Sequence, residues 1–169
     1  MAKKLWIIGC LILLTIPAWA ANIDISGRAG VYTPTQAGAS PTMMYGVSAD
    51  YRLNENLSVR GALETTTYTA NNVQYAFTPV TLDLIYSQSF GENLHPYAGA
   101  GMSYNSTTSG GSTTQTAGAQ TEVGIRYNLG GFSAGFELRY LIPDLNHTDM
   151  GSSSYNGYAT GSFSQSLSF

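Results

Sequence analysis

Cysteine, lysine and tryptophan are scarce in this sequence, and all of them lie near its start. Cys10 is the only cysteine among 169 residues, so the chain has no partner for an internal disulfide. Lysine occurs only as Lys3 and Lys4, and charged residues make up 10% of the chain. The longest apolar run, residues 5–16, is too short to cross a bilayer as a helix. The sequence therefore excludes a disulfide scaffold and offers no transmembrane helix.

The start of the chain has the layout of a secretory signal peptide. The two lysines give a positive start, residues 5–16 form an apolar core, and Pro17 breaks it. Ala18-Trp19-Ala20 is a small-x-small cleavage site. We therefore predict a cleaved signal peptide over residues 1–20. Residues 21–169 then form one mature domain, a size that suits a single fold.

A lipoprotein signal is the alternative for this segment, because Ile7-Ile8-Gly9-Cys10 resembles a lipobox. The apolar stretch before Cys10 covers only residues 5–9, however, and a longer one follows it. That order favours a cysteine inside an ordinary signal peptide.

The mature chain is acidic and poor in helix-forming residues. Its five arginines stand against ten acids, which gives a net charge of −5. Binding to nucleic acid needs clustered lysine and arginine at the phosphates, so we expect no nucleic-acid partner. Glycine, serine, threonine and tyrosine are abundant instead, which favours strands and turns.

Alternation with a period of two dominates the mature chain and predicts β-strands. Val123 and Ile125, for example, alternate with Glu122 and Gly124. Eight such segments occur, at residues 23–31, 46–53, 57–64, 80–87, 96–105, 120–129, 132–140 and 158–169.

The links between these segments alternate in length. Short turns are expected at residues 54–56, 91–93 and 130–131, and longer polar links at 33–43, 69–74, 106–117 and 143–154. Outer-membrane barrels have short periplasmic turns and longer external loops, so both chain ends would lie in the periplasm. We expect the third long link to be mobile, because residues 105–116 consist almost only of Ser, Thr, Gly and Gln.

Charge placement indicates which face of the strands points inward. A soluble lipocalin-like barrel has apolar side chains inside, whereas a membrane barrel has them outside. Every strand charge falls on a polar face, arginines and acids are nearly balanced, and no lysine is present to suit a solvated surface. We therefore predict an internal salt-bridge network that stabilises the barrel. Its members are Asp24, Arg28, Asp50, Arg52, Arg60, Glu64, Asp83, Glu122, Arg126, Glu137 and Arg139.

Aromatic residues near the strand ends lie on the apolar faces, as in the girdles at a membrane–water boundary. They are Tyr51, Tyr86, Tyr127, Phe132, Tyr140 and Phe169. A bilayer also demands closure, because each backbone polar group needs a partner there. The predicted fold is all-β, an eight-stranded antiparallel up-and-down transmembrane β-barrel.

The sequence resembles a known group, the small eight-stranded outer-membrane barrels of the OmpA/OmpX/OmpW-like, porin-like type. The resemblance rests on the signal peptide, on residues 95–104 (HPYAGAGMSY), and on the terminal strand with Phe163, Leu167 and Phe169. In such families the terminal aromatic strand is read by the barrel-assembly machinery. Here Ser164 stands where Gly is frequent, and Gln165 interrupts the apolar stripe.

The resemblance implies a monomer in the outer membrane of a Gram-negative cell, in contact with lipid and lipopolysaccharide. We expect a structural or surface-interaction role, with four polar loops exposed outside. A narrow channel for small solutes is the first alternative, although eight strands enclose only enough room for side chains.

A lipid A-modifying enzyme is the second alternative, because lipid A deacylases of this shape use a His-Ser pair with an acid. His147, Ser152 to Ser154 and Glu137 are the residues available, but the family's His-x-Ser-Asn pattern is absent. His95 and His147 would lie at opposite barrel ends, which makes a shared metal site implausible. We therefore predict no catalytic residue, no cofactor and no metal site.

Overall fold

The computed structural model describes residues 23–34, 36–130, 132–146 and 156–167, the last of these as backbone only. The predicted signal peptide (1–20), His147, Ser152 to Ser154 and Phe169 lie outside the described residues. No described helix is long and apolar enough to cross a membrane.

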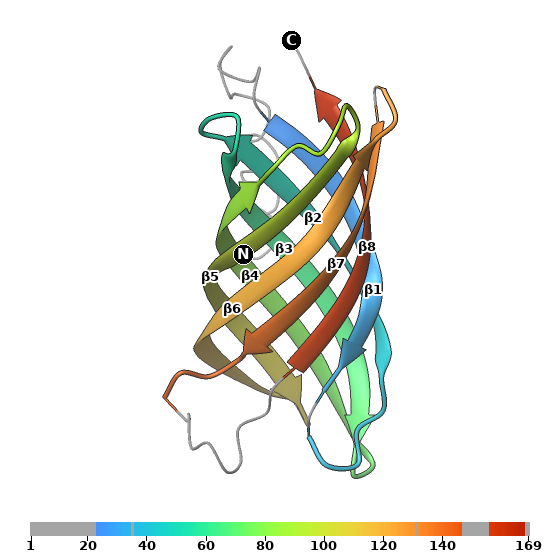
Figure 1. The fold of residues 1–169 in the computed structure, drawn as a ribbon. Coiled ribbons are helices and arrows are strands. Elements are labelled where there is room, and N and C mark those ends of the chain that lie inside the picture. The colour runs from blue at the N-terminus through green and yellow to red at the C-terminus, as the bar shows by residue number, and fades with distance from the viewer. Residues whose placement is uncertain (1–22, 35, 131, 147–155, 168–169) are drawn as a thin grey trace.

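Eight antiparallel strands form one closed barrel in which each strand pairs with its neighbours in sequence, and β1 pairs with β8 (Figure 1). This confirms the predicted fold class. The strands are β1 (Ile23–Thr33), β2 (Thr42–Arg52), β3 (Leu57–Ala70), β4 (Val73–Ser87), β5 (Leu94–Ser109), β6 (Ser112–Asn128), β7 (Phe132–Ile142) and β8 (Asn156–Leu167).

Burial alternates along the strands, with the apolar residues outside. Leu82 and Met102 are 63% and 64% exposed, whereas Arg60 and Glu122 are 3% and 2% exposed. The predicted inside-out arrangement is therefore correct. Ile85, which breaks the polar face of its segment, points inward and is buried.

The two ends of the barrel differ. The turn end, at the top of Figure 1, carries the links 53–56, 88–93 and 129–131 together with the start of β1 and the end of β8. The loop end carries the links that follow β1, β3, β5 and β7.

Two of the expected long links at the loop end are instead tight hairpins. β3 and β4 are joined by Asn71 and Asn72, and β5 and β6 by Gly110 and Gly111, all four at positive φ. Two-residue hairpin turns need this backbone conformation, which Asn and Gly adopt readily. The Ser/Thr-rich stretch expected to be mobile is therefore paired strand, and the prediction of four long polar loops is wrong for these two links.

The middle four strands extend beyond their neighbours at the loop end. Pairing of β2 with β3 ends at Thr66, and pairing of β6 with β7 ends at Ala119. Pairing within β3, β4, β5 and β6 continues to the hairpin tips. Residues 67–76 and 103–118 thus form a four-stranded extension, called the projecting sheet below, which contains no charged residue.

Inward-facing glycines are a steric requirement of this interior. An added Cβ at Gly101 would collide with the Leu82 carbonyl oxygen and lie 2.6 Å from Asp83 Cα, whereas one at Gly61 would meet nothing within 4 Å. We expect Gly101→Ala to lower the free energy of unfolding by about 1–3 kcal/mol, as overpacking does. Urea titration in lipid vesicles measures it. Gly61→Ala is the matched control, and equal effects of the two changes would contradict the steric account.

Candidate functional site

Glu137 on β7 accepts hydrogen bonds from four side chains of the described barrel interior. It accepts hydrogen bonds from Arg60 at 2.6 Å, from Arg139 at 2.9 Å, and from Arg28. The hydroxyl of Tyr97 on β5 donates a fourth at 2.7 Å. Four elements of the wall therefore meet at one carboxylate.

Two further carboxylates complete the buried centre. Glu64 lies 3.1 Å from Arg28 and 2.5 Å from Arg139, and Glu122 lies 2.9 Å from Arg60 and 3.3 Å from Arg139. The side chains of all these residues are 3% exposed or less. Each charged residue of this centre has opposite charges on more than one strand, which offsets the cost of removing it from water.

Toward the turn end the network becomes accessible to solvent. Asp50 accepts from Arg60 at 2.7 Å and from Arg126 at 3.1 Å, and Asp24 accepts from Arg52 at 2.6 Å. The Arg126 side chain is 22% exposed and the Arg52 side chain 52% exposed. The network thus has a buried centre around Glu137, called the dry centre below, and a solvent-exposed end around Arg52 and Arg126, called the mouth.

All eleven residues of the network predicted from sequence lie on the inner side of the strands, and the structure joins ten of them by ion pairs. Asp83 is the exception, because it accepts from Thr81 at 3.0 Å and from Gln120 at 2.6 Å.

Tyr97 was not foreseen from the sequence. Besides donating to Glu137, its ring lies 5.1 Å from the Arg60 guanidinium carbon and 5.9 Å from that of Arg126. It therefore separates the dry centre from the mouth. Its position in the inward register of Gly99 and Gly101 was the available signal.

An apolar cluster closes the interior at the loop end, which the sequence reading also missed. Tyr32, Met44, Phe77 and Leu141 are buried against one another, and the rings of Tyr32 and Phe77 stack at 5.4 Å. Tyr68 packs on the cluster. Alternate residues of a strand point inward. Tyr32 follows Arg28 by four residues and Leu141 follows Arg139 by two, so the inward charges predict that both of these residues also point inward.

The link between β1 and β2 is fastened over this cluster. Gln36 donates to the Tyr75 hydroxyl at 3.3 Å and accepts from the Tyr68 hydroxyl at 3.4 Å. The Tyr68 and Tyr75 rings stack at 5.2 Å. The loop end of the interior is thus covered by aromatic rings and by a loop bonded to them.

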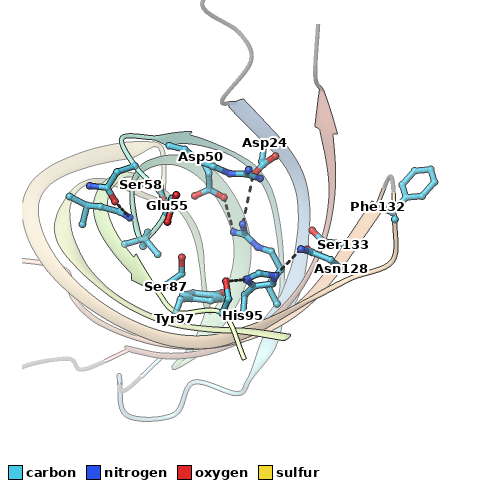
Figure 2. Close-up of a pocket in the computed structure, with 17 residues that line it drawn as sticks. Asp24, Asp50, Glu55, Ser58, Ser87, His95, Tyr97, Asn128, Phe132 and Ser133 are labelled. Atoms are coloured by element: carbon cyan, nitrogen blue, oxygen red, sulfur yellow. Dashed lines mark hydrogen bonds and ion pairs between the residues drawn. The ribbon is translucent and has the colours of Figure 1, made fainter. Parts of the chain in front are cut away.

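The turn end instead holds a polar chamber with a volume of about 470 Å³ (Figure 2). Asp24 and Asp50 line one side of it, and Tyr97 and His95 the other, whereas Phe132 points away at the rim. His95 is held between Ser89 at 3.2 Å and Asn128 at 2.9 Å. The predicted turn histidine therefore lies at the start of β5 and lines the chamber.

Of the residues weighed for catalysis, only Glu137 lies in the described part of the chain. Glu137, the acid on the strand that precedes the last loop, points into the barrel and is bound by three arginines and Tyr97. Within that part, no group of three or more His, Cys, Asp or Glu side chains is placed to hold a metal ion.

The terminal strand is described as backbone. Phe163 lies opposite Gly27 of β1 and Leu167 opposite Ile23, so both belong to the pairing that closes the barrel. The two residues are four apart and therefore share one face of β8.

Comparison with known proteins decides the family. The sequence model described as "Outer membrane protein beta-barrel domain" matches residues 7–169. The chain belongs to this family. Membership places the protein in the outer membrane of Gram-negative bacteria. By sequence, no curated protein matches the chain.

Solved structures share the fold at low sequence identity. Neisserial surface protein A is 18% identical with a TM-score of 0.70, over 86% of this chain and 97% of that one. The attachment invasion locus protein Ail of Yersinia pestis is 13% identical with a TM-score of 0.57, over 85% and 97%. The outer membrane enzyme PagL is 10% identical with a TM-score of 0.56, over 85% and 99%.

Removing the central carboxylate tests the network. Glu137→Gln leaves the arginines bound there without that opposite charge, and breaking a buried ion pair costs about 3–5 kcal/mol. We expect a loss of that size in urea unfolding of the barrel in vesicles. Arg52→Ala is the control, since an exposed pair contributes about 0–1 kcal/mol. A Glu137 variant as stable as the Arg52 variant would contradict the assignment.

Proposed function

We propose that this protein is a sealed outer-membrane barrel with a structural and surface-interaction role, not a channel. The turn end and both chain termini face the periplasm, and the loop end faces outward. Short turns on the periplasmic side and longer hairpins outside are the pattern of bacterial barrels, which supports this orientation. A cleaved signal peptide over residues 1–20 would direct export, and Phe163, Leu167 and Phe169 would guide assembly.

The observation that carries the proposal is the filling of the interior. The apolar cluster of Tyr32, Met44, Phe77 and Leu141 lies at the loop end of the interior. Between it and the turn end, ion pairs such as Arg60 to Glu122 join separate strands of the wall. The chamber of about 470 Å³ lies on the turn-end side of these ion pairs. Eight strands leave little space beyond their own side chains.

The projecting sheet supplies the surface for interaction. Its strands β5 and β6 present paired rows of hydroxyl groups, including Thr108 and Thr113 bonded at 2.9 Å. On β3 and β4, the hydroxyl groups of Thr65 and Thr78 form a hydrogen bond at 3.1 Å next to the projecting sheet, on its membrane side. A stiff, uncharged and hydroxylated surface of this kind fits contact with the sugars of lipopolysaccharide or with another cell-surface molecule.

The names of three structural relatives bear on the choice of role. Neisserial surface protein A and the attachment invasion locus protein carry surface-related names, whereas PagL is described as an enzyme. At these identities the likeness carries the fold alone. The interior engagement of Glu137 supports the non-enzymatic role for this chain.

A conductance measurement tests whether the barrel is sealed. We expect purified protein in planar bilayers to give no reproducible single-channel current, because the apolar cluster interrupts any water path. A steady conductance whose ion selectivity changes on substitution of Arg60, Arg126 or Arg139 would overturn the proposal and establish the narrow channel.

Trimming the sheet tests the surface role. Deleting Thr107–Thr114 and joining the strands by Asn-Gly shortens one hairpin while leaving the membrane band intact. We expect vesicles bearing this variant to lose binding to immobilised lipopolysaccharide and to cell surfaces, with unchanged heat-modifiable gel mobility. Equal binding by trimmed and full-length barrels would refute the role. Lipid A mass spectra that differ with and without the protein would point to the enzyme instead.

A further inference from the structure

The chamber at the turn end lies at the opposite end of the barrel from the projecting sheet, so the surface role proposed above gives it no task. Its volume of about 470 Å³ suits a small molecule. Asp24 and Asp50 lie on one side of it, and Ser87, Tyr97 and His95 on the other (Figure 2). An apolar ligand would remove water from these groups without replacing its hydrogen bonds, so the chamber favours a polar one.

Two arginines that line the chamber keep hydrogen-bond donors in reserve. A guanidinium group has five N–H donors. Within the described part of the chain, the Arg52 side chain donates one hydrogen bond, to Asp24 at 2.6 Å, and the Arg126 side chain donates one, to Asp50 at 3.1 Å. The Arg52 side chain is half-exposed and that of Arg126 is partly exposed. A solute in the chamber can therefore reach both guanidinium groups.

The acids beside these arginines already accept hydrogen bonds or form ion pairs. Asp50 also accepts from Arg60 at 2.7 Å. One Asp24 oxygen lies 2.6 Å from Arg52 and 3.8 Å from Arg126, so the two guanidinium groups lie close together. The wall thus offers spare donors next to acceptors that are in use, and it fits a ligand that supplies acceptors of its own.

The charge in and against the chamber favours a ligand with a single negative charge. Three arginines are balanced there by three acids, namely Arg52, Arg60, Arg126, Asp24, Asp50 and Glu55. The acids would repel a ligand with several negative charges, whereas one carboxylate can form paired hydrogen bonds with a guanidinium group. We propose that the chamber binds a small molecule through one free carboxylate, held by Arg52 and Arg126.

The wall opposite the two aspartates indicates the rest of the ligand. His95 lies between Ser89 at 3.2 Å and Asn128 at 2.9 Å, and Ser87 lies on the same side. Hydroxyl and amide groups of this kind both donate and accept, so they match the amides of a short peptide or the hydroxyls of a sugar acid. In the orientation proposed above, either solute would enter from the periplasm.

The test uses the protein in lipid nanodiscs with nitrogen-15 in its arginines. The probes are N-acetyl-alanyl-alanine and gluconate, which each carry one carboxylate, and the control is N-acetyl-alanyl-alanine amide. For at least one carboxylate we expect saturable shifts of the Arg52 and Arg126 Nε–H signals with a Kd of about 1 mM or tighter. The amide should cause none, and the signals of Arg28 and Arg139 in the dry centre should not move. The tighter probe identifies the source of the carboxylate.

Arg52→Gln is the decisive variant, because this side chain lies at the exposed end of the network and its loss leaves the dry centre intact. We expect about tenfold weaker binding, as when a hydrogen bond between charged groups is lost. Arg52→Lys keeps the charge without the planar pair of donors and should recover part of the affinity. Glu55→Gln is the matched control, since it removes an acid from the same rim and should leave binding equal or tighter.

Three results would overturn the inference: no saturable shift with either carboxylate, equal shifts with the amide, or equal affinity of Arg52→Gln and the unmodified protein. A loss in Glu55→Gln as large as that in Arg52→Gln would also count against it. The surface role is tested separately, because Arg52→Gln should keep the lipopolysaccharide and cell-surface binding that hairpin trimming removes. If trimming abolishes that binding and the carboxylates fail to bind, the chamber assignment alone is wrong.

Discussion

Buried charges in a narrow barrel must be paired, and the rest of this structure depends on that constraint. The centre of the interior holds arginines from β1, β3 and β7 and glutamates from β3, β6 and β7. Arg28 and Glu137 are 109 residues apart in sequence, and Arg60 and Glu122 are 62 apart. These pairs form only when the sheet has closed, so pairing of charge and closure of the barrel stabilise each other.

The glycines of the barrel interior are required by the large side chains on the neighbouring strands. An added Cβ at Gly124 would lie 2.5 Å from the Tyr97 hydroxyl, and one at Gly99 would lie 3.1 Å from the Glu122 carboxylate. The Tyr97 and Glu122 side chains can therefore occupy the interior only because glycine lies beside them on the next strand. The result is an interior whose centre is filled by side chains, with a chamber at the turn end.

Much of this follows from the sequence because alternation and charge act together. Period two located all eight strands, and the absence of lysine separated an interior network from a solvated surface. The outer limits of the strands did not follow, because the Ser/Thr/Gly composition of residues 105–116 is shared by loops and hairpins. Gly110-Gly111 and Asn71-Asn72 were the turn signals. The sequence pattern did not predict that Tyr97 and the apolar cluster point inward. Hydrophobic and aromatic residues were expected on the outer face, whereas their position in the strand alternation places these residues on the inner face.

The division of the barrel into zones explains why one small domain can combine rigidity with recognition. The centre of the barrel has its arginine and glutamate charges paired within the chain, and so it has little capacity for a charged ligand. The projecting sheet inherits its geometry from the same strands but lies beyond the ion pairs. Its backbone is held in register by the pairing of β3, β4, β5 and β6, which continues from the membrane band to the hairpin tips. A preformed sheet loses little entropy on binding, so a partner molecule can be contacted without a pocket.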